Sequence, residues 1–187
     1  MIDAESYHHE QKRKGGDIPY VSHLLSVCSL VLEAGGTETE AIAALLHDAV
    51  EDAGGPPVLA AILRDYGPEV AAIVEHCSDA APERGERKAP WMQRKQDYIE
   101  RLRTADASTL LVSAADKLHN LRTIQADCER GEPVFERFSA PADKRANTLW
   151  YYQSLFDIYA DPAAAPDPRR THLTKPLGVL LAWFRDH

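Results

Sequence analysis

The sequence places one imidazole and three carboxylates inside segment 41–52, which otherwise has the composition of a buried helix. These side chains belong to His47, Asp48, Glu51 and Asp52. Removing water from several carboxylates is costly unless cations or hydrogen bonds replace the lost hydration. A solvated acidic face is the alternative, but the neighbouring alanine, leucine and valine residues leave little polar surface for it. The segment therefore favours a site that binds a divalent cation.

Helical spacing predicts that these four side chains lie along one side of a cleft. His47 and Glu51 are four residues apart, as are Asp48 and Asp52, and residues four apart share a helix face. The adjacent His47 and Asp48 lie roughly 100° apart around the axis. Both can reach one ion only if it lies beside the helix, so further ligands must come from elsewhere in the chain.

The segment before residue 24 offers an imidazole next to positive charge. A basic pair, Arg13 and Lys14, precedes a glycine-rich turn, and Pro19 is a good first-turn residue for the apolar helix that begins near His23. Taken alone, His23 is more typical of a capping or core histidine than of a ligand. Together with segment 41–52, it is a candidate ligand.

A second segment, 110–123, offers a carboxylate on an apolar helix. Asp116, Asn120 and Thr123 are spaced at i, i+4 and i+7, apart from a core stripe that includes Leu111 and Leu118. One ligand and two hydrogen-bonding groups are therefore expected to share a cleft wall.

The three segments resemble the HD-domain phosphohydrolases. The resemblance narrows to the hydrolase domain of RelA/SpoT proteins and the stand-alone small alarmone hydrolases through the patterns R-K-x4-P-Y-x2-H, H-D-x-x-E-D and A-D-K-L-H-N-L-R-T. It covers about residues 5–160 and implies one metal ion with four ligands: His23, His47, Asp48 and Asp116. This mixed N/O set suits Mn²⁺, with Zn²⁺, Fe²⁺ or Co²⁺ able to compete. Glu51 and Asp52 lie beyond that set and can orient the attacking water and take its proton.

The same resemblance implies a reaction and a substrate. In that family, pyrophosphate is removed from the 3′ position of guanosine tetra- or pentaphosphate. The residues expected to contact the substrate are Arg13, Lys14, Lys95, Asn120, Thr123 and Arg145. The basic pair would flank the nucleotide, the amide and the hydroxyl would contact its ribose, and Arg145 would face its phosphates. Lys95 would supply positive charge from across the cleft.

Two departures from the family pattern leave alternatives open. No segment after residue 159 has room for the synthetase half, so we expect this chain only to degrade the alarmone. Leu149 stands where some stand-alone members have an aromatic residue, which leaves adenosine analogues open as substrates. An HD phosphohydrolase acting on a nucleoside monophosphate or NADPH, and a non-catalytic nucleotide sensor, are the other classes that we weigh.

Composition fits a small single-domain enzyme. The chain has 187 residues, of which 44% are hydrophobic and 27% charged, an ordinary balance for a globular protein. A net charge of −8 argues against nucleic acid as a partner. No apolar run approaches the ~20 residues needed to cross a bilayer, and residues 1–16 lack a signal-peptide core. We therefore expect a cytoplasmic protein with no membrane partner and three reduced cysteines, and homo-oligomers are allowed.

The apolar periodicity predicts an all-α fold, and the resemblance implies a single-domain helical bundle of the HD type. Helices are expected near residues 3–12, 20–34, 38–53, 57–65, 68–77, 91–103, 107–126, 141–160 and 175–185. Thr37 and Glu40 form a predicted capping box, and segment 79–90 reads as a surface loop. We assign 1–160 to the catalytic domain and 161–187 to a linker and a helical tail. The tail is expected to pack on the catalytic body or another subunit, because its apolar residues recur at helical spacing: Leu177, Leu180, Leu181, Trp183 and Phe184.

Overall fold

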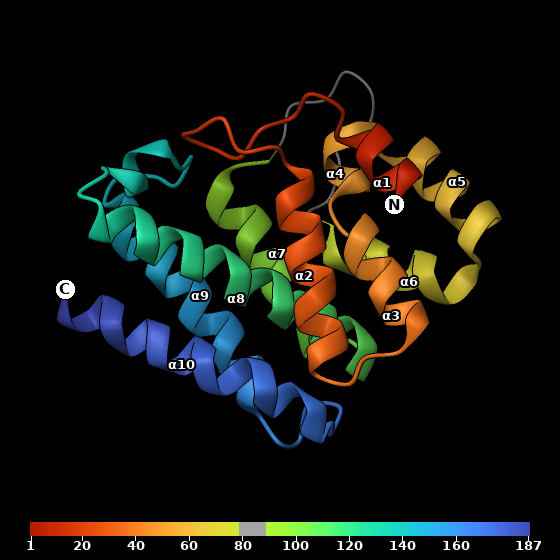
Figure 1. Ribbon diagram of the computed structural model, residues 1–187. Coiled ribbons are helices and arrows are strands. Elements are labelled where there is room, and N and C mark those ends of the chain that lie inside the picture. The colour runs from red at the N-terminus through yellow and green to blue at the C-terminus, as the bar shows by residue number, and fades with distance from the viewer. Residues whose placement is uncertain (79–88) are drawn as a thin grey trace.

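The computed structural model describes residues 1–78 and 89–187, and within these ranges the chain is a bundle of helices (Figure 1). The α-helices are α1 (Ile2–Tyr7), α2 (Val21–Glu33), α3 (Glu38–Leu46), α4 (Ala49–Ala53), α5 (Pro56–Tyr66), α6 (Pro68–Cys77), α7 (Trp91–Arg103), α8 (Ala107–Glu129), α9 (Lys144–Ala160) and α10 (Thr171–Asp186). The short 3-10 helices η1 (Val134–Arg137) and η2 (Pro168–Arg170) precede α9 and α10. The described ranges contain no strand, only one isolated bridge, between Lys12 and Pro19. The all-α prediction is confirmed.

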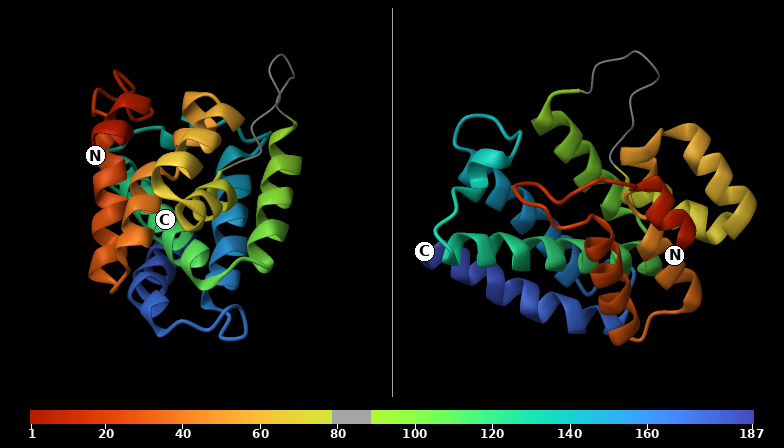
Figure 2. Two further views of the ribbon diagram at one scale, coloured as in Figure 1. Left: turned by 90° about the vertical axis from the view of Figure 1, so that its right-hand side faces the viewer. Right: turned by 45° about the horizontal axis from the view of Figure 1, so that its top comes forward.

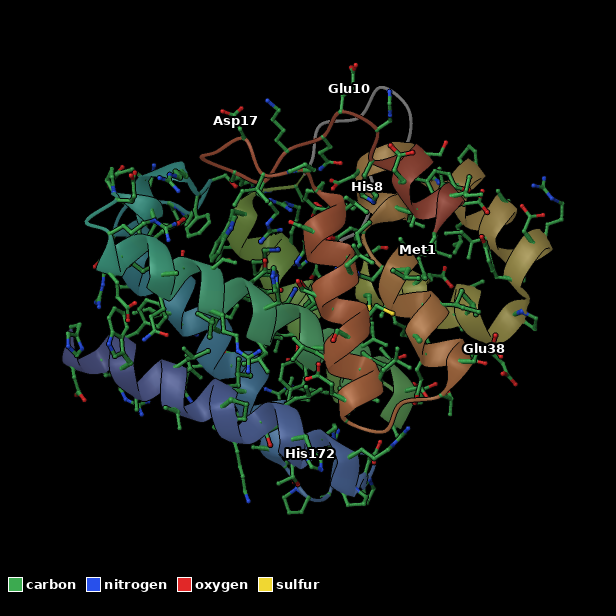
Figure 3. The ribbon with its side chains drawn as sticks, in the orientation of Figure 1. Met1, His8, Glu10, Asp17, Glu38 and His172 are labelled. Atoms are coloured by element: carbon green, nitrogen blue, oxygen red, sulfur yellow. The ribbon has the colours of Figure 1, made fainter. Side chains whose placement is uncertain are left out.

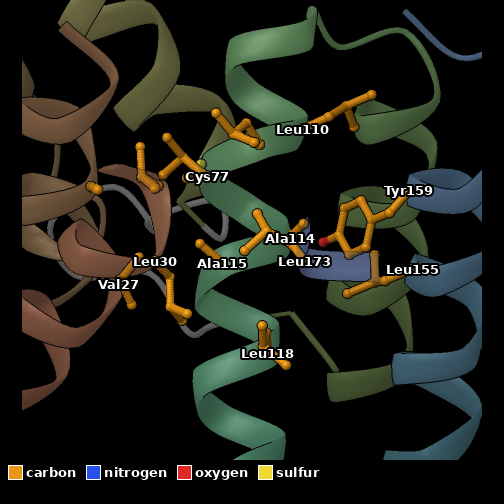
Figure 4. Close-up of a cluster of buried hydrophobic side chains, with 14 of the residues drawn as sticks. Val27, Leu30, Cys77, Leu110, Ala114, Ala115, Leu118, Leu155, Tyr159 and Leu173 are labelled. Carbon is orange, nitrogen blue, oxygen red and sulfur yellow. The ribbon is translucent and has the colours of Figure 1, made fainter. Parts of the chain in front are cut away.

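Helix α8 runs through the middle of the bundle. It packs against α2, α3 and α6 on one side and against α9 and α10 on the other (Figures 1 and 2). Figure 4 shows Leu110, Ala114 and Leu118 of α8 between Val27 of α2 and Leu155 of α9, and all five side chains are fully buried. The core on both sides therefore fixes the position of α8, which carries the Asp116 segment.

Side-chain caps define where two of the central helices begin. The predicted capping box of α3 is confirmed, because the Glu40 amide donates to Thr37 Oγ1 (3.3 Å) and the Thr37 amide donates to Glu40 Oε2 (2.6 Å). Asp106 caps α8 in the same way by accepting a hydrogen bond from the Thr109 amide (2.7 Å). Such caps satisfy amides that the first turn leaves unpaired. They hold the start of the two helices that lead to His47 and Asp116.

The single helix predicted over 38–53 is wrong, because the structure has two helices with a break at His47 and Asp48. In a continuous helix the Ala44 carbonyl would accept from the Asp48 amide. Here His47 Nδ1 donates to that carbonyl instead (2.8 Å), and α4 starts afresh when the Asp52 amide donates to the Asp48 carbonyl (3.0 Å). The two residues therefore lie in a turn, which frees their side chains from strict helical spacing.

The first helix also ends earlier than predicted, at Tyr7 rather than residue 12. Glu10 has a φ of 62°, which is incompatible with a continuing helix. Residues 8–20 instead form a loop whose ends are joined by the Lys12–Pro19 bridge. Figure 3 shows Glu10 and Asp17 at the outer edge of this loop. The basic pair of the N-terminal motif therefore lies in a loop, not in a helix.

The C-terminal tail packs on the rest of the bundle. Helix α10 starts at Thr171, earlier than the predicted residue 175, includes Pro176, and lies against α8 and α9. Its apolar side chains Leu177, Leu181 and Phe184 are buried. Most of the predicted surface loop, residues 79–88, lies outside the described residues. In the part of the chain that the structure describes, none of the helices is both long and apolar enough to cross a bilayer.

Candidate metal centre and cleft

The structure brings together the four side chains predicted to bind metal. They meet where the start of α2, the break between α3 and α4, and the middle of α8 approach one another. His23 Nε2 lies 3.4 Å from Asp48 Oδ2 and 3.2 Å from Asp116 Oδ1. His47 Nε2 lies 3.0 Å and 3.7 Å from the same two oxygens. The ligand atoms of His23, His47 and Asp116 all lie within 4.8 Å of one another, and Asp48 Oδ2 adjoins this group through the two imidazoles.

The donor set fits a divalent cation. The Nε2 atoms of His23 and His47 are buried and have no hydrogen-bond partner among the described residues, and an unsatisfied buried polar atom costs about 1–3 kcal/mol. Because His47 Nδ1 donates to the Ala44 carbonyl, the neutral ring has its lone pair on Nε2. Lone pairs from two imidazoles beside two carboxylates are ligands that divalent transition metals accept.

Without a cation, the same carboxylates attract a proton. Burial alone lowers the pKa of His47, but the nearby charges of Asp48 and Asp116 outweigh it and raise that pKa to about 10. Burial would raise the pKa of Asp48, yet His47 and His23 hold it well below its usual range. The cluster is therefore strongly selective for positive charge at its centre, as a metal site must be.

Two side chains that the sequence interpretation did not single out contact the candidate ligands. The Tyr20 hydroxyl donates to Asp48 Oδ2 (2.7 Å), and burial together with Asp48 raises the pKa of Tyr20, so the hydroxyl stays protonated. His23 Nδ1 lies 2.7 Å from Nδ1 of His119. Burial, with His23 and Arg13 nearby, lowers the pKa of His119 to about 4. Tyr20 and His119 both belong to the sequence motifs described above, but helical spacing alone did not indicate these contacts.

Asp116 is held on its other side by a chain of polar contacts. Its Oδ2 accepts from Lys117 Nζ (2.5 Å) and its Oδ1 from Asn120 Nδ2 (2.5 Å). The Asn120 amide oxygen accepts in turn from Arg13 Nη2 (2.6 Å). Burial would raise the pKa of Asp116, but Lys117 and the two histidines lower it well below its usual range. The basic N-terminal loop is thus connected to the metal centre through two side chains.

The two predicted water-activating residues line a cleft beside this centre. Glu51 and Asp52 belong to α4, and both contribute to the cleft wall. Asp52 Oδ2 accepts from Gln11 Nε2 (2.9 Å), and His8 Nδ1 is bonded to the amide oxygen of Gln11 (2.7 Å). The N-terminal segment thereby orients a carboxylate of α4, a contact that no helical spacing could indicate.

The cleft is large enough for a nucleotide and rich in positive charge. Its volume is about 890 Å³, within the range typical of small-molecule sites. Five of the predicted substrate residues line it: Arg13, Lys14, Lys95, Asn120 and Thr123. Lys95 Nζ lies 4.8 Å from the ring centre of Tyr151. Lys117 and Arg137, which the sequence interpretation did not select, also line the cleft.

Arg145 does not face the cleft, contrary to the prediction. Its Nη2 donates to the Phe184 carbonyl of α10 (2.6 Å), and its guanidinium lies 5.6 Å from the ring centre of Phe135. Leu149, one helical turn later, lines a small groove with Leu181 of α10. Residues four apart share a helix face, and in this structure Arg145 and Leu149 both lie beside α10. The cleft is lined instead by Thr148, Tyr151 and Tyr152 of α9.

The curated relatives of the chain match it over only part of their own length. A segment of 125 residues is 34% identical to a probable GTP pyrophosphokinase of Mycobacterium leprae, and covers 65% of this chain but 15% of that protein. A segment of 165 residues is 34% identical to the GTP pyrophosphokinase rsh of Brucella suis, covering 85% of this chain and 19% of that protein. MESH1 of Xenopus tropicalis, guanosine-3′,5′-bis(diphosphate) 3′-pyrophosphohydrolase, is 34% identical over 125 residues, 65% of each chain. The chain thus spans less than two thirds of each of these relatives.

Solved structures agree with the fold. The protein lmo0812 of Listeria monocytogenes EGD-e superposes with a TM-score of 0.69 at 28% identity, covering 88% of this chain and 99% of that one. A metazoan ortholog of SpoT that hydrolyzes ppGpp superposes with a TM-score of 0.70 at 24% identity, covering 99% and 90%. Residues 2–138 match the HD domain family, and they include all four candidate ligands. The chain belongs to the HD domain family.

Proposed function

We propose that this chain is a metal-dependent hydrolase that removes the 3′-pyrophosphate of alarmone nucleotides such as ppGpp. The observation that carries the proposal is the pair of buried Nε2 atoms, on His23 and His47, that face the carboxylates of Asp48 and Asp116 beside a cleft rich in lysine and arginine. The activity of the relative MESH1, a guanosine-3′,5′-bis(diphosphate) 3′-pyrophosphohydrolase, supports the choice of substrate. Guanosine and adenosine alarmones are both within the proposal.

In this proposal, His23, His47, Asp48 and Asp116 hold one ion. Mn²⁺ suits their mixed set best, and Zn²⁺, Fe²⁺ or Co²⁺ can compete. When bound, such an ion lowers the pKa of water and polarises a phosphoryl oxygen. The protein's own part is to keep both carboxylates ionised and both imidazole lone pairs directed inward, which the low carboxyl pKa values and the His47–Ala44 bond support.

Glu51 and Asp52 are proposed to orient the attacking water and to accept its proton. The water oxygen adds to the phosphorus next to the ribose O3′ and the bond from that phosphorus to O3′ breaks. O3′ takes up the proton that left the water, so pyrophosphate and a nucleoside 5′-diphosphate with a free 3′-hydroxyl separate. Gln11 holds Asp52 for this role by donating to Oδ2. Arg13, Lys14 and Lys95 are proposed to neutralise the phosphates, and Asn120 and Thr123 to contact the ribose from the cleft wall.

The proposal is tested by a substrate screen with Mn²⁺. Purified protein is incubated with ppGpp, pppGpp, ppApp, NADPH and nucleoside monophosphates, and the release of pyrophosphate and phosphate is measured separately. We expect pyrophosphate from the alarmones. Phosphate from NADPH or from a monophosphate would replace the proposal with another HD phosphohydrolase. Binding of nucleotide without release under any divalent ion would identify a sensor.

Carboxylate variants test the two proposed roles. Glu51→Gln and Asp52→Asn should lower turnover by about 10²–10⁴-fold, the usual contribution of general-base catalysis, while metal content and substrate affinity stay at the parent values. Glu38→Gln, at an exposed carboxylate at the start of α3 (Figure 3), is the control and should leave turnover unchanged. Parent-level turnover in both α4 variants would contradict the roles.

The proposal also includes a cytoplasmic location, where nucleotide substrates are made, and a preference for mononucleotides over nucleic acid, which the net charge of −8 supports. Competition of ppGpp turnover by single-stranded RNA would contradict that preference. Sedimentation of the purified chain would decide between a monomer and a homo-oligomer.

A further inference from the structure

The two imidazoles of the metal centre are held in different ways. His47 Nδ1 donates to a backbone carbonyl, which ends that chain of hydrogen bonds. His23 Nδ1 instead meets a second imidazole, with 2.7 Å between its Nδ1 and Nδ1 of His119 and 4.8 Å between the ring centres. Two ring nitrogens at that distance share one proton, so one of them donates and the other accepts. The distance does not show which of the two imidazoles donates in the His23–His119 hydrogen bond, so the direction must follow from the tautomer of each ring.

The metal centre decides that direction. If His23 Nε2 holds the ion, as the proposed function requires, its lone pair is on Nε2 and its proton on Nδ1. His119 Nδ1 must then accept, and a neutral imidazole that accepts through Nδ1 has its own proton on Nε2. His119 is half-buried and lines the cleft, and the described residues offer no hydrogen-bond partner to its Nε2. That N–H is left for a ligand.

The surroundings of His119 suit an anionic ligand. His119 follows Asp116 by three residues on α8, so it lies one turn away on nearly the same face. The next residue, Asn120, binds the guanidinium of Arg13, and both line the same cleft. A phosphoryl oxygen that enters beside the metal centre would meet a cation and an N–H donor together.

Resting on the proposed function, we propose that His119 acts at two points of the reaction centre. Through Nδ1 it is a positioning residue that accepts from His23 and keeps the His23 lone pair on Nε2. Through Nε2–H it contacts a phosphoryl oxygen of the substrate. One side chain therefore couples the geometry of the ion to the binding of the nucleotide.

Two isosteric variants separate these roles. In His119→Asn the amide oxygen occupies the place of Nδ1 and can accept from His23, but the shorter side chain does not reach the position of Nε2. His119→Leu has the same branching and offers neither group. The measurements are Mn²⁺ affinity by competition with a chelator, binding of inorganic pyrophosphate to the Mn²⁺-loaded protein, and KM and kcat with ppGpp.

The Asn variant should bind Mn²⁺ like the parent but bind pyrophosphate roughly 10-fold more weakly, with a matching rise in KM, because it loses a hydrogen bond to a charged group. The Leu variant should also lose about 10–100-fold in Mn²⁺ affinity, the usual effect of removing the partner of a ligating histidine. Parent-level Mn²⁺ affinity in the Leu variant would overturn the positioning role. Parent-level pyrophosphate affinity in the Asn variant would overturn the substrate contact.

A measurement on the parent keeps the proposal testable if a variant fails to fold. In the Zn²⁺-loaded protein, ¹⁵N chemical shifts should show His119 protonated on Nε2 and bare on Nδ1, and the reverse tautomer would overturn the inference. A parent that binds Mn²⁺ but hydrolyses no alarmone would overturn the proposed function alone, because Mn²⁺ affinity and the tautomer would still decide the role of His119.

Discussion

Two clusters of buried charge among the described residues have similar burial but differ in how their hydrogen-bonding groups are satisfied. The ligand cluster consists of His23, His47, Asp48 and Asp116. The junction cluster consists of Glu40, Asp167 and Arg169, and ties the start of α3 to η2. The carboxylates of Glu40 and Asp167 are 2% and 6% exposed, comparable with 7% for Asp116. Burial alone therefore does not distinguish the two clusters.

Hydrogen-bond satisfaction does distinguish them. In the junction cluster, Arg169 donates to both oxygens of Glu40 (2.8 and 3.0 Å) and to both oxygens of Asp167. In the ligand cluster, two imidazole nitrogens have no hydrogen-bond partner among the described residues, although both lie near carboxylate oxygens. A cluster whose charges satisfy one another stabilises the fold, whereas a cluster with lone pairs aimed at one shared point is built for a ligand.

The largest predicted effect is on Mn²⁺ affinity and turnover, when an aspartate is replaced by asparagine in each cluster in turn. Asp48→Asn removes a charged ligand and should lower Mn²⁺ affinity and ppGpp turnover by more than ~10²-fold, since loss of a mere supporting contact already costs 10–100-fold. Asp167→Asn should keep both values near those of the parent. Equal losses in the two variants would remove the functional distinction between the clusters.

The second prediction concerns a substitution in the junction cluster, which should lower stability but not turnover. Arg169→Met leaves Glu40 buried without its cation, and removal of one partner of a buried ion pair destabilises by about 3–5 kcal/mol. We expect the lower end of that range, because the Arg169 side chain is 29% exposed. Urea unfolding measures the change, and turnover below the melting transition should persist. Arg64→Met, in an exposed pair with Asp65, is the control and should barely change stability.

The third prediction uses the ion itself. Because only the folded ligand cluster binds it, an ion at about 100 times its Kd should add about 2.7 kcal/mol of stability. For a chain of this size that corresponds to a rise of roughly 5–10 °C in Tm. Calorimetry before and after chelation measures the rise, and Asp48→Asn should abolish it. A Tm that is the same with and without the ion would show that the ligand cluster does not bind it in the folded state.

The ligand cluster itself was predictable, because its residue types are costly to bury and therefore conspicuous in an apolar sequence. His23 and His47 lie within ion-pair distance of both Asp48 and Asp116, although three separate segments supply these residues. Metal binding by the four residues stays a prediction. The start of α3 after its cap Thr37 and the start of α6 at Pro68 followed from local capping and proline rules. These features depend on a few neighbouring residues, which sequence patterns describe well.

The remaining features depend on contacts between distant parts of the chain. The break at His47 arises because a side chain takes a backbone carbonyl, which periodicity cannot detect. Arg145 donates to the Phe184 carbonyl of α10. Its long side chain can reach partners on either side of α9, so the sequence alone does not show which side it takes. The roles of Tyr20 and His119 depend on which oxygen or nitrogen each meets across helices. The division at residue 160 stays a prediction.

The last prediction concerns acid, which should weaken the junction cluster through its carboxylates. Burial would raise the pKa of Glu40 and that of Asp167, but hydrogen bonds from Arg169 lower both below their ordinary values. The unfolded chain therefore binds more protons than the folded one in the acid range. Stability from this cluster is complete above the unfolded pKa values of about 4 and is lost as the pH falls through the lower folded values.

Urea unfolding of the metal-free protein from pH 6 to pH 3 measures this loss. In Arg169→Met the burial of Glu40 is no longer opposed by a guanidinium, so its folded pKa should rise toward or above the unfolded value. The slope of stability against pH below pH 5 should then shrink relative to the parent, while Arg64→Met keeps the parent slope. Equal slopes in the parent and in Arg169→Met would show that the acid sensitivity arises outside the junction cluster. The paired charges of Glu40, Asp167 and Arg169 would then not stabilise the fold in the way proposed.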